Sequence, residues 1–156
     1  MASTLTVDNI VGATDASLVM VPGHVVQVKN FTTTAQTNTT STSYIDTAIT
    51  INITPTSASN KVLVRLYCAL RADQVSNAGA GVAVVRNGAN IGEQRYMGWN
   101  NVGQYGQDTV FIEILDSPAT TSSVTYKAQV RTENGNNINF GHDNGIKGIT
   151  VMEIAQ

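Results

Sequence analysis

Apolar and polar residues alternate along most of the chain with a period of two. The clearest run is 61–72, in which one parity is apolar and the other carries three charges, at Lys61, Arg65 and Arg71. This alternation predicts a strand with one buried face, formed by Val62, Val64, Leu66, Cys68 and Leu70. Similar patterns predict further strands at 24–31, 44–53, 81–86, 89–96, 109–115, 123–132, 137–140 and 148–154.

Turn residues separate these strands. Asn87-Gly88 tolerates the positive φ angles of a type I′ hairpin turn, and Asn134-Gly135 predicts a second tight turn. Segment 32–43 is too polar for a core and is expected to be a loop or an exposed edge. Strong helix formers are sparse. About eight or nine short strands with turns between them predict an all-β antiparallel sandwich or barrel.

The first 22 residues differ from the rest of the chain. They contain short apolar groups separated by small and polar residues, with neither a helical nor a strand period. We therefore expect an extended N-terminal arm at 1–22 and a β domain at 23–156. Because the arm cannot bury its apolar side chains alone, a partner is expected to cover Leu5, Val7, Ile10, Val11, Leu18, Val19 and Val21.

Composition excludes several classes of protein. Charged residues form 13% of the 156-residue chain, about half the usual fraction, and Thr, Asn, Ser and Gln take their place. A net charge of −2 gives no basic surface for nucleic acid. No apolar run is long enough for membrane insertion, and the start lacks the pattern of a secretory signal. A single cysteine excludes a disulfide framework within the chain.

Candidate catalytic chemistry is thin, and we expect no enzyme, catalytic residue, metal site or cofactor. His142 and Asp143 are adjacent, so they can converge only in a turn. Cys68 lies on the apolar face of its strand and is expected to be a buried structural thiol. A glycan-degrading enzyme would need facing carboxylates. In the local cluster of Asp108, Glu113 and Asp116, the strand parity of Glu113 differs from that of the other two.

The loop at 97–107 is more informative. Tyr96, Trp99 and Tyr105 lie in or beside it, among amide residues that include Asn100 and Asn101. Aromatic rings with amides suit sugar binding, because the rings pack on C–H groups and the amides bond hydroxyls. The same composition suits a subunit interface, or rings that fold back onto the domain. The sequence leaves these three interpretations open.

Segments spread through the chain resemble those of small virion structural proteins of tailed bacteriophages, many from marine and cyanobacterial hosts. The segments are 3–10, 21–28, 44–47, 53–55, 59–64 and 149–156, in the same order, and 79–107 shows no match. The resemblance implies a homotrimeric fibre, spike or decoration protein, with an N-terminal anchor and a jelly-roll-like head similar to the C1q/TNF type.

The combined expectation is a virion protein that assembles in the host cytoplasm. Its partners would be copies of itself and other virion proteins of the capsid or of the tail and baseplate. One role is a trimeric appendage, a fibre, spike or knob, that contacts host-surface polysaccharide through 79–107. The alternative is a decoration or cement protein that stabilises the head and binds no ligand.

Overall fold

The computed structural model describes residues 21–72, 79–97 and 105–156, and the backbone alone at 96 and 97. Nearly all of this part of the chain is β structure. The strands are β1 (Val25–Thr33), β2 (Thr37–Thr39), β3 (Ile45–Ile53), β4 (Lys61–Ala72), β5 (Gly79–Arg86), β6 (Ala89–Met97), β7 (Gly106–Asp116), β8 (Val124–Thr132), β9 (Ile138–Phe140) and β10 (Lys147–Ile154). A 3₁₀ turn, η2 (His142–Asn144), precedes β10.

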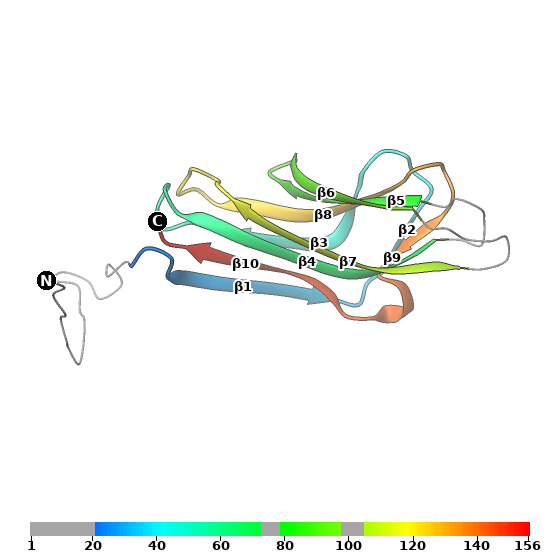
Figure 1. Ribbon diagram of the computed structural model, residues 1–156, viewed down its shortest axis with the longest axis horizontal. Coiled ribbons are helices and arrows are strands. Elements are labelled where there is room, and N and C mark those ends of the chain that lie inside the picture. Colours follow the sequence, from blue (N-terminus) through cyan, green and yellow to red (C-terminus); the bar gives the residue numbers. More distant parts are fainter. Residues whose placement is uncertain (1–20, 73–78, 98–104) are drawn as a thin grey trace, which may run out of the picture.

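The strands form two antiparallel sheets that pack face to face (Figure 1). Sheet A contains β1, β10, β4 and β7 side by side, and β9 and β2 extend it beyond β10 on the same edge of β4. Sheet B has the order β3-β8-β5-β6. The pairs β1–β10, β3–β8, β4–β7 and β5–β6 are nested in sequence, which is the jelly-roll arrangement. The predicted all-β sandwich is confirmed.

The core lies between the two sheets and is built from the alternating positions that the sequence indicates. In β4, the apolar parity from Val62 to Leu70 is buried. Opposite it, sheet B contributes buried valines of β5 and β8, together with Tyr126. Branched side chains dominate because they pack well on a pleated surface.

Turn chemistry is confirmed at the central hairpin. Asn87 and Gly88 both have positive φ angles, 47° and 87°, as a type I′ turn requires. The Asn87 side-chain oxygen accepts a hydrogen bond from the Thr125 backbone amide, which ties the hairpin to β8. No helix in the described part of the chain is both long and apolar enough to cross a bilayer.

The structure refines the predicted boundaries in one place. Segment 32–43 is not wholly loop, because β2 forms there and pairs with β9 at the sheet edge. In β3, the pairing with β8 shifts register between Asp46 and Thr50; Ile45 is partly buried, and Ile49 is fully buried. The inward positions keep the single parity that the sequence predicts, because every even-numbered residue of the strand is exposed.

Candidate interaction surface

Most residues predicted to anchor or to bind lie outside the described ranges. These are Leu5, Val7, Ile10, Val11, Leu18 and Val19 of the arm, and Trp99, Asn100 and Asn101 of the aromatic loop. Val21 is described and is 59% exposed, just before β1. The backbone of Tyr96 pairs with Ala80 in sheet B. The anchoring and ligand-binding roles of these residues therefore remain predictions.

Tyr105 is the one loop aromatic whose side chain is described. Its ring is about half exposed, and the Arg71 guanidinium lies over it, 4.4 Å from the ring centre. One face of this ring is therefore occupied by a cation from β4. Stacking of this kind fixes Tyr105 against the domain, as one of the three sequence interpretations expects.

A larger feature lies on the outer surface of sheet A, which we call the A face. Strand register places the outward-pointing residues of four strands in rows across the sheet. The first row is apolar, the second is polar, and the third contains two aromatic residues. The rows are Val28-Met152-Leu63-Leu115, Asn30-Thr150-Arg65-Glu113 and Thr32-Gly148-Tyr67-Phe111.

Apolar side chains on the A face are unusually open to solvent. Val28, Leu115 and Phe111 are 55–56% exposed, and Val25, next to Ile154, is also exposed. The described residues contain seven exposed large hydrophobic side chains; four lie on the A face, and none belongs to a sheet B strand. Apolar surface is concentrated on one side of the sandwich.

The polar row of the A face is paired within the chain. Arg65 forms an ion pair with Glu113 on the neighbouring strand. Asn30 donates a hydrogen bond to the Thr150 hydroxyl at 2.8 Å. These side chains therefore have partners before any other molecule approaches. Tyr67 lies over Gly148, since a Cβ at that glycine would stand 3.1 Å from the tyrosine oxygen.

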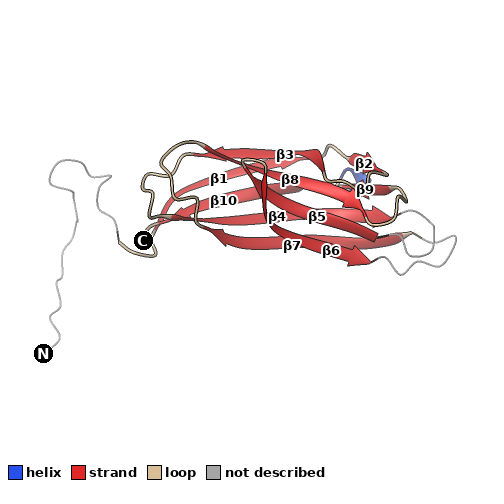
Figure 2. Cartoon of the chain, turned by 90° about the horizontal axis from the view of Figure 1, so that it is seen from above, coloured by secondary structure: helices blue, strands red, loops and turns tan. Residues whose placement is uncertain are grey.

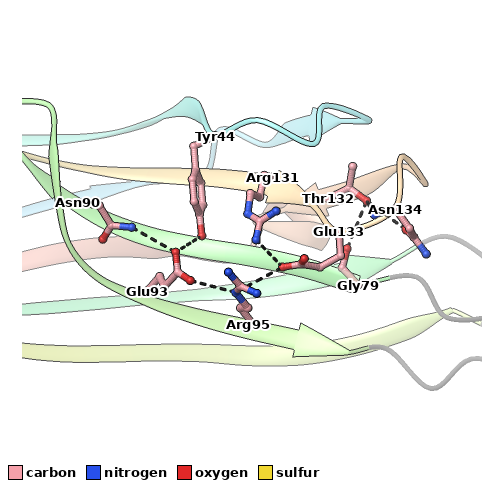
Figure 3. Close-up of polar contacts among 9 residues, drawn as sticks. All are labelled: Tyr44, Gly79, Asn90, Glu93, Arg95, Arg131, Thr132, Glu133 and Asn134. Atoms are coloured by element: carbon pink, nitrogen blue, oxygen red, sulfur yellow. Dashed lines mark hydrogen bonds and ion pairs between the residues drawn. The ribbon is translucent and has the colours of Figure 1, made fainter.

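The outer surface of sheet B, the B face, has the opposite character. Figure 3 shows Glu93 accepting a hydrogen bond from Tyr44 and pairing with Arg95. Arg131 pairs with Glu133, and on the same sheet Lys127 pairs with Asp46. The Tyr44 and Arg95 contacts lower the pKa of the Glu93 carboxyl, which keeps it ionised at neutral pH. The charged side chains named on this surface are paired with one another.

The side chains of His142 and Asp143 contact each other because the two residues lie in a turn. Within η2, Asp143 has a positive φ of 62°, and its carboxylate lies 2.9 Å from His142 Nε2. The Gln107 amide contacts the same ring nitrogen at 3.3 Å. Among the described residues no group of three or more His, Cys, Asp or Glu side chains could hold a metal ion.

The three carboxylates considered for glycan cleavage do not meet. Glu113 lies on the A face, paired with Arg65. Asp116 is buried on the other side of the same strand, where it accepts hydrogen bonds from Arg86 and from Tyr126 at 2.6 Å. Asp108 is exposed and accepts a bond from the following backbone amide. The arrangement offers no facing acid and base.

Two buried ionisable residues were not identified from the sequence. Lys147 is 1% exposed, and its ammonium has no hydrogen-bond partner. It is close enough to Cys68 for an electrostatic interaction. Burial lowers the lysine pKa and raises that of the Cys68 thiol. The predicted burial of Cys68 is confirmed.

Glu153 is the second buried ionisable residue, and its carboxylate is fully hydrogen-bonded. Its carboxylate accepts hydrogen bonds from the Thr56 amide at 2.7 Å, Asn60 at 2.7 Å and Gln27 at 2.6 Å. Burial raises the pKa of Glu153, but these donors outweigh it and the net pKa is lowered. The residue joins β1, the 54–60 turn and β10.

Comparison with known proteins finds no matching family model and no curated protein with a similar sequence. Several solved structures are similar in fold. One is infectious bursal disease virus, Gt strain (13% identity, TM-score 0.46), covering 99% of this chain and 38% of that one. Another is T=1 particles derived from infectious bursal virus (13%, TM-score 0.47), covering 94% and 36%.

A third is the insecticidal delta-endotoxin Cry8Ea1 of Bacillus thuringiensis (18%, TM-score 0.40), covering 75% of this chain and 19% of that one. The chain thus spans less than two fifths of each of these structures. Virus particles are among its structural neighbours, and a toxin is too. At these identities and TM-scores the likeness does not bear on activity, substrate or partner.

Proposed function

We propose that this chain is a non-enzymatic structural component of a tailed-bacteriophage virion. In this role it forms a trimeric appendage, a fibre, spike or knob, held by its N-terminal arm. The observation that carries the proposal is the exposed apolar A face on a domain with few charges. Such a domain is suited to permanent packing against protein, because covering neutral and apolar groups costs far less than covering unpaired charges.

Two further observations support a structural role. The resemblance of segments 3–10, 21–28 and 149–156 to small phage virion proteins spans both ends of the chain. Among the described residues, the candidate acid–base groups are separated or paired: Glu113 and Asp116 lie on opposite sides of β7. These features favour assembly over catalysis.

The arm provides the test. Deleting residues 2–21 removes the apolar groups that a virion partner would bury, so the truncated chain should fold but be absent from purified particles. The control carries Ser in place of three polar arm residues, Thr4, Thr6 and Asn9, and should be incorporated normally. Normal incorporation of the deleted chain would contradict the anchoring role.

Trimer formation is tested by a separate measurement of the mass in solution. Light scattering of the purified full chain should give three times the monomer mass. A stable monomer at all concentrations would contradict trimer formation. It would leave the virion role to be decided by the arm deletion, since a monomer can still be anchored in a particle.

Decoration of the capsid is the second candidate, and the A face favours it as well, since a shell surface could cover that face. Copy number separates the two roles: hundreds of copies per particle indicate decoration, and tens or fewer indicate an appendage. For the appendage, we expect the intact protein to bind host polysaccharide on a glycan array and the Trp99→Ala variant to bind less. Absence of binding by the intact protein would argue against host contact.

A further inference from the structure

We propose that the A face is an interface with a second copy of this chain. The inference rests on the self-association in the proposed function and names the surface that carries it. It draws only on described residues of β1, β10, β4 and β7.

The first argument is the asymmetry between the two faces of one sandwich. Lys127 and Asp46 on the B face form an ion pair whose side chains are 40% and 47% exposed. Arg65 and Glu113 on the A face form a comparable pair, 45% and 43% exposed. On the A face, however, this pair is flanked by Leu115 and Phe111, both more than half exposed. Exposed apolar groups on one face alone mark a surface that is covered in the working protein.

The second argument is the free energy needed to remove the polar row of the A face from water. Burial of an unpaired charge is strongly unfavourable, whereas a charge that already has a partner can be covered at lower cost. Every side chain of the polar row has such a partner, through Arg65–Glu113 and Asn30–Thr150. The A face can therefore lose its water without leaving a polar side chain of this row alone.

Charge distribution favours a second copy over a strongly acidic or basic partner. Arg65 and Glu113 place both signs side by side in the middle row of the A face. A surface of mixed sign is complementary to another surface of mixed sign, and a second copy offers one on either side of its sandwich, through Arg65–Glu113 or Lys127–Asp46. A strongly charged partner would instead be repelled by one member of the pair.

The size of the A face agrees. Four strands about 4.8 Å apart, with about ten residues each on average at about 3.3 Å per residue, give a surface of roughly 20 by 33 Å. That is on the order of 700 Å², close to the roughly 800 Å² per partner of a specific protein interface. The area of the A face is therefore comparable to one partner's share of a specific interface.

The first test is association of the full chain. The variant Phe111→Ser/Leu115→Ser should weaken self-association on the order of 100-fold in sedimentation equilibrium, because it removes the two most exposed large apolar side chains of the A face. Both side chains are more than half exposed, so the fold should be retained, as circular dichroism will verify. The matched control is Ile146→Ser, which removes an apolar side chain that is 69% exposed and lies before β10, outside the strands of the A face, and should change nothing.

The second test identifies the occupant. With Phe111 replaced by photoreactive benzoylphenylalanine, illumination should join two copies of the chain, with attachment sites within residues 21–156 of the second copy. Crosslinks formed only within one chain, to residues 1–20, would overturn the proposal and make the arm the occupant. Crosslinks only to another virion protein would overturn it as well.

These outcomes separate the inference from the proposed function. If the double variant associates as tightly as the unaltered chain and still enters particles, the inference fails and the virion role stands. If association depends on the A face but purified particles lack the chain, the virion role fails and the interface stands.

Discussion

Lys147 is a charged residue that is buried in the core, where most side chains are apolar. Its side chain runs over Gly141, where an added Cβ would lie 2.0 Å from the lysine Cε. Its ammonium, with no hydrogen-bond partner, stands inside the sandwich. An unpaired buried ammonium opposes folding, because the charged form loses its hydration.

The variant Lys147→Met should therefore stabilise the domain by about 1–3 kcal/mol at pH 7, since methionine fills a similar channel without a charge. In the unaltered protein the folded pKa is lowered, so the unfolded chain binds more protons between that value and about 10.5. Stability should rise with pH across this window, and the methionine variant should lack the rise. Urea unfolding at pH 7 and pH 9.5 measures both effects. A less stable methionine variant would show that the ammonium has a stabilising partner.

Glu153 is the opposite case, a buried charge with every partner in place. Replacing it by glutamine should cost about 2–4 kcal/mol at pH 7, because donors from Thr56, Asn60 and Gln27 lose an ionised acceptor. The folded pKa is lowered, so this stabilisation is complete above the unfolded value of about 4.3 and is lost as pH falls through the folded value.

The difference between the unaltered protein and Glu153→Gln should therefore shrink in acid. Glu113→Gln is the matched control, since its half-exposed ion pair should contribute no more than about 1 kcal/mol. Denaturant unfolding from pH 7 to pH 3 makes the comparison. A difference that stays constant over this range would mean that the carboxylate is not what holds the cluster.

The position of a strand in its sheet depends on close backbone contacts as well as on the alternation of apolar and polar residues. Gly148 in β10 allows the strand to pass close to β1, since a Cβ there would lie 2.4 Å from the Phe31 carbonyl oxygen. Gly148→Ala should destabilise the domain by about 1–3 kcal/mol, because the backbone must shift. Gly145→Ala, where the nearest atom is 3.6 Å away, should be close to neutral in the same thermal unfolding experiment. Equal effects of the two substitutions would contradict this account of β10.

At the scale of strands and turns, much of the fold can be predicted from the sequence. The run 61–72 gives both the bounds of β4 and its buried parity, because one strand paired on both sides has a strict period. Asn87-Gly88 predicts its hairpin from local chemistry alone. Edge strand β2 escapes prediction because its Thr-Asn-Thr sequence has no apolar period, and it is held by pairing with β9.

The A face could not be predicted from the sequence, for a physical reason. Leu63, Leu115 and Met152 come from three distant segments, and only the register of the sheet places them in one row. Within its own strand each looks like an ordinary apolar residue. The contact of His142 with Asp143 was hidden in the same way, since it requires a left-handed backbone at Asp143.

At the scale of the whole molecule, the charged and the exposed apolar residues are distributed unevenly between the two faces. Ion pairs of sheet B lie on the B face, while four of the seven exposed large hydrophobic side chains among the described residues lie on the A face. Figures 1 and 2 show the strands of the two sheets that carry these faces. One side of the sandwich is suited to water and the other to protein. The first described residue, Val21, precedes β1, an edge strand of sheet A.

The presence of the chain in the virion is the most direct test of the account. Particles purified through a density gradient can be analysed by quantitative mass spectrometry against a major capsid protein as internal standard. We expect the chain to sediment with infectious particles at a fixed copy number per particle. Its absence from purified particles, together with its abundance in the lysate that yielded them, would contradict the proposal.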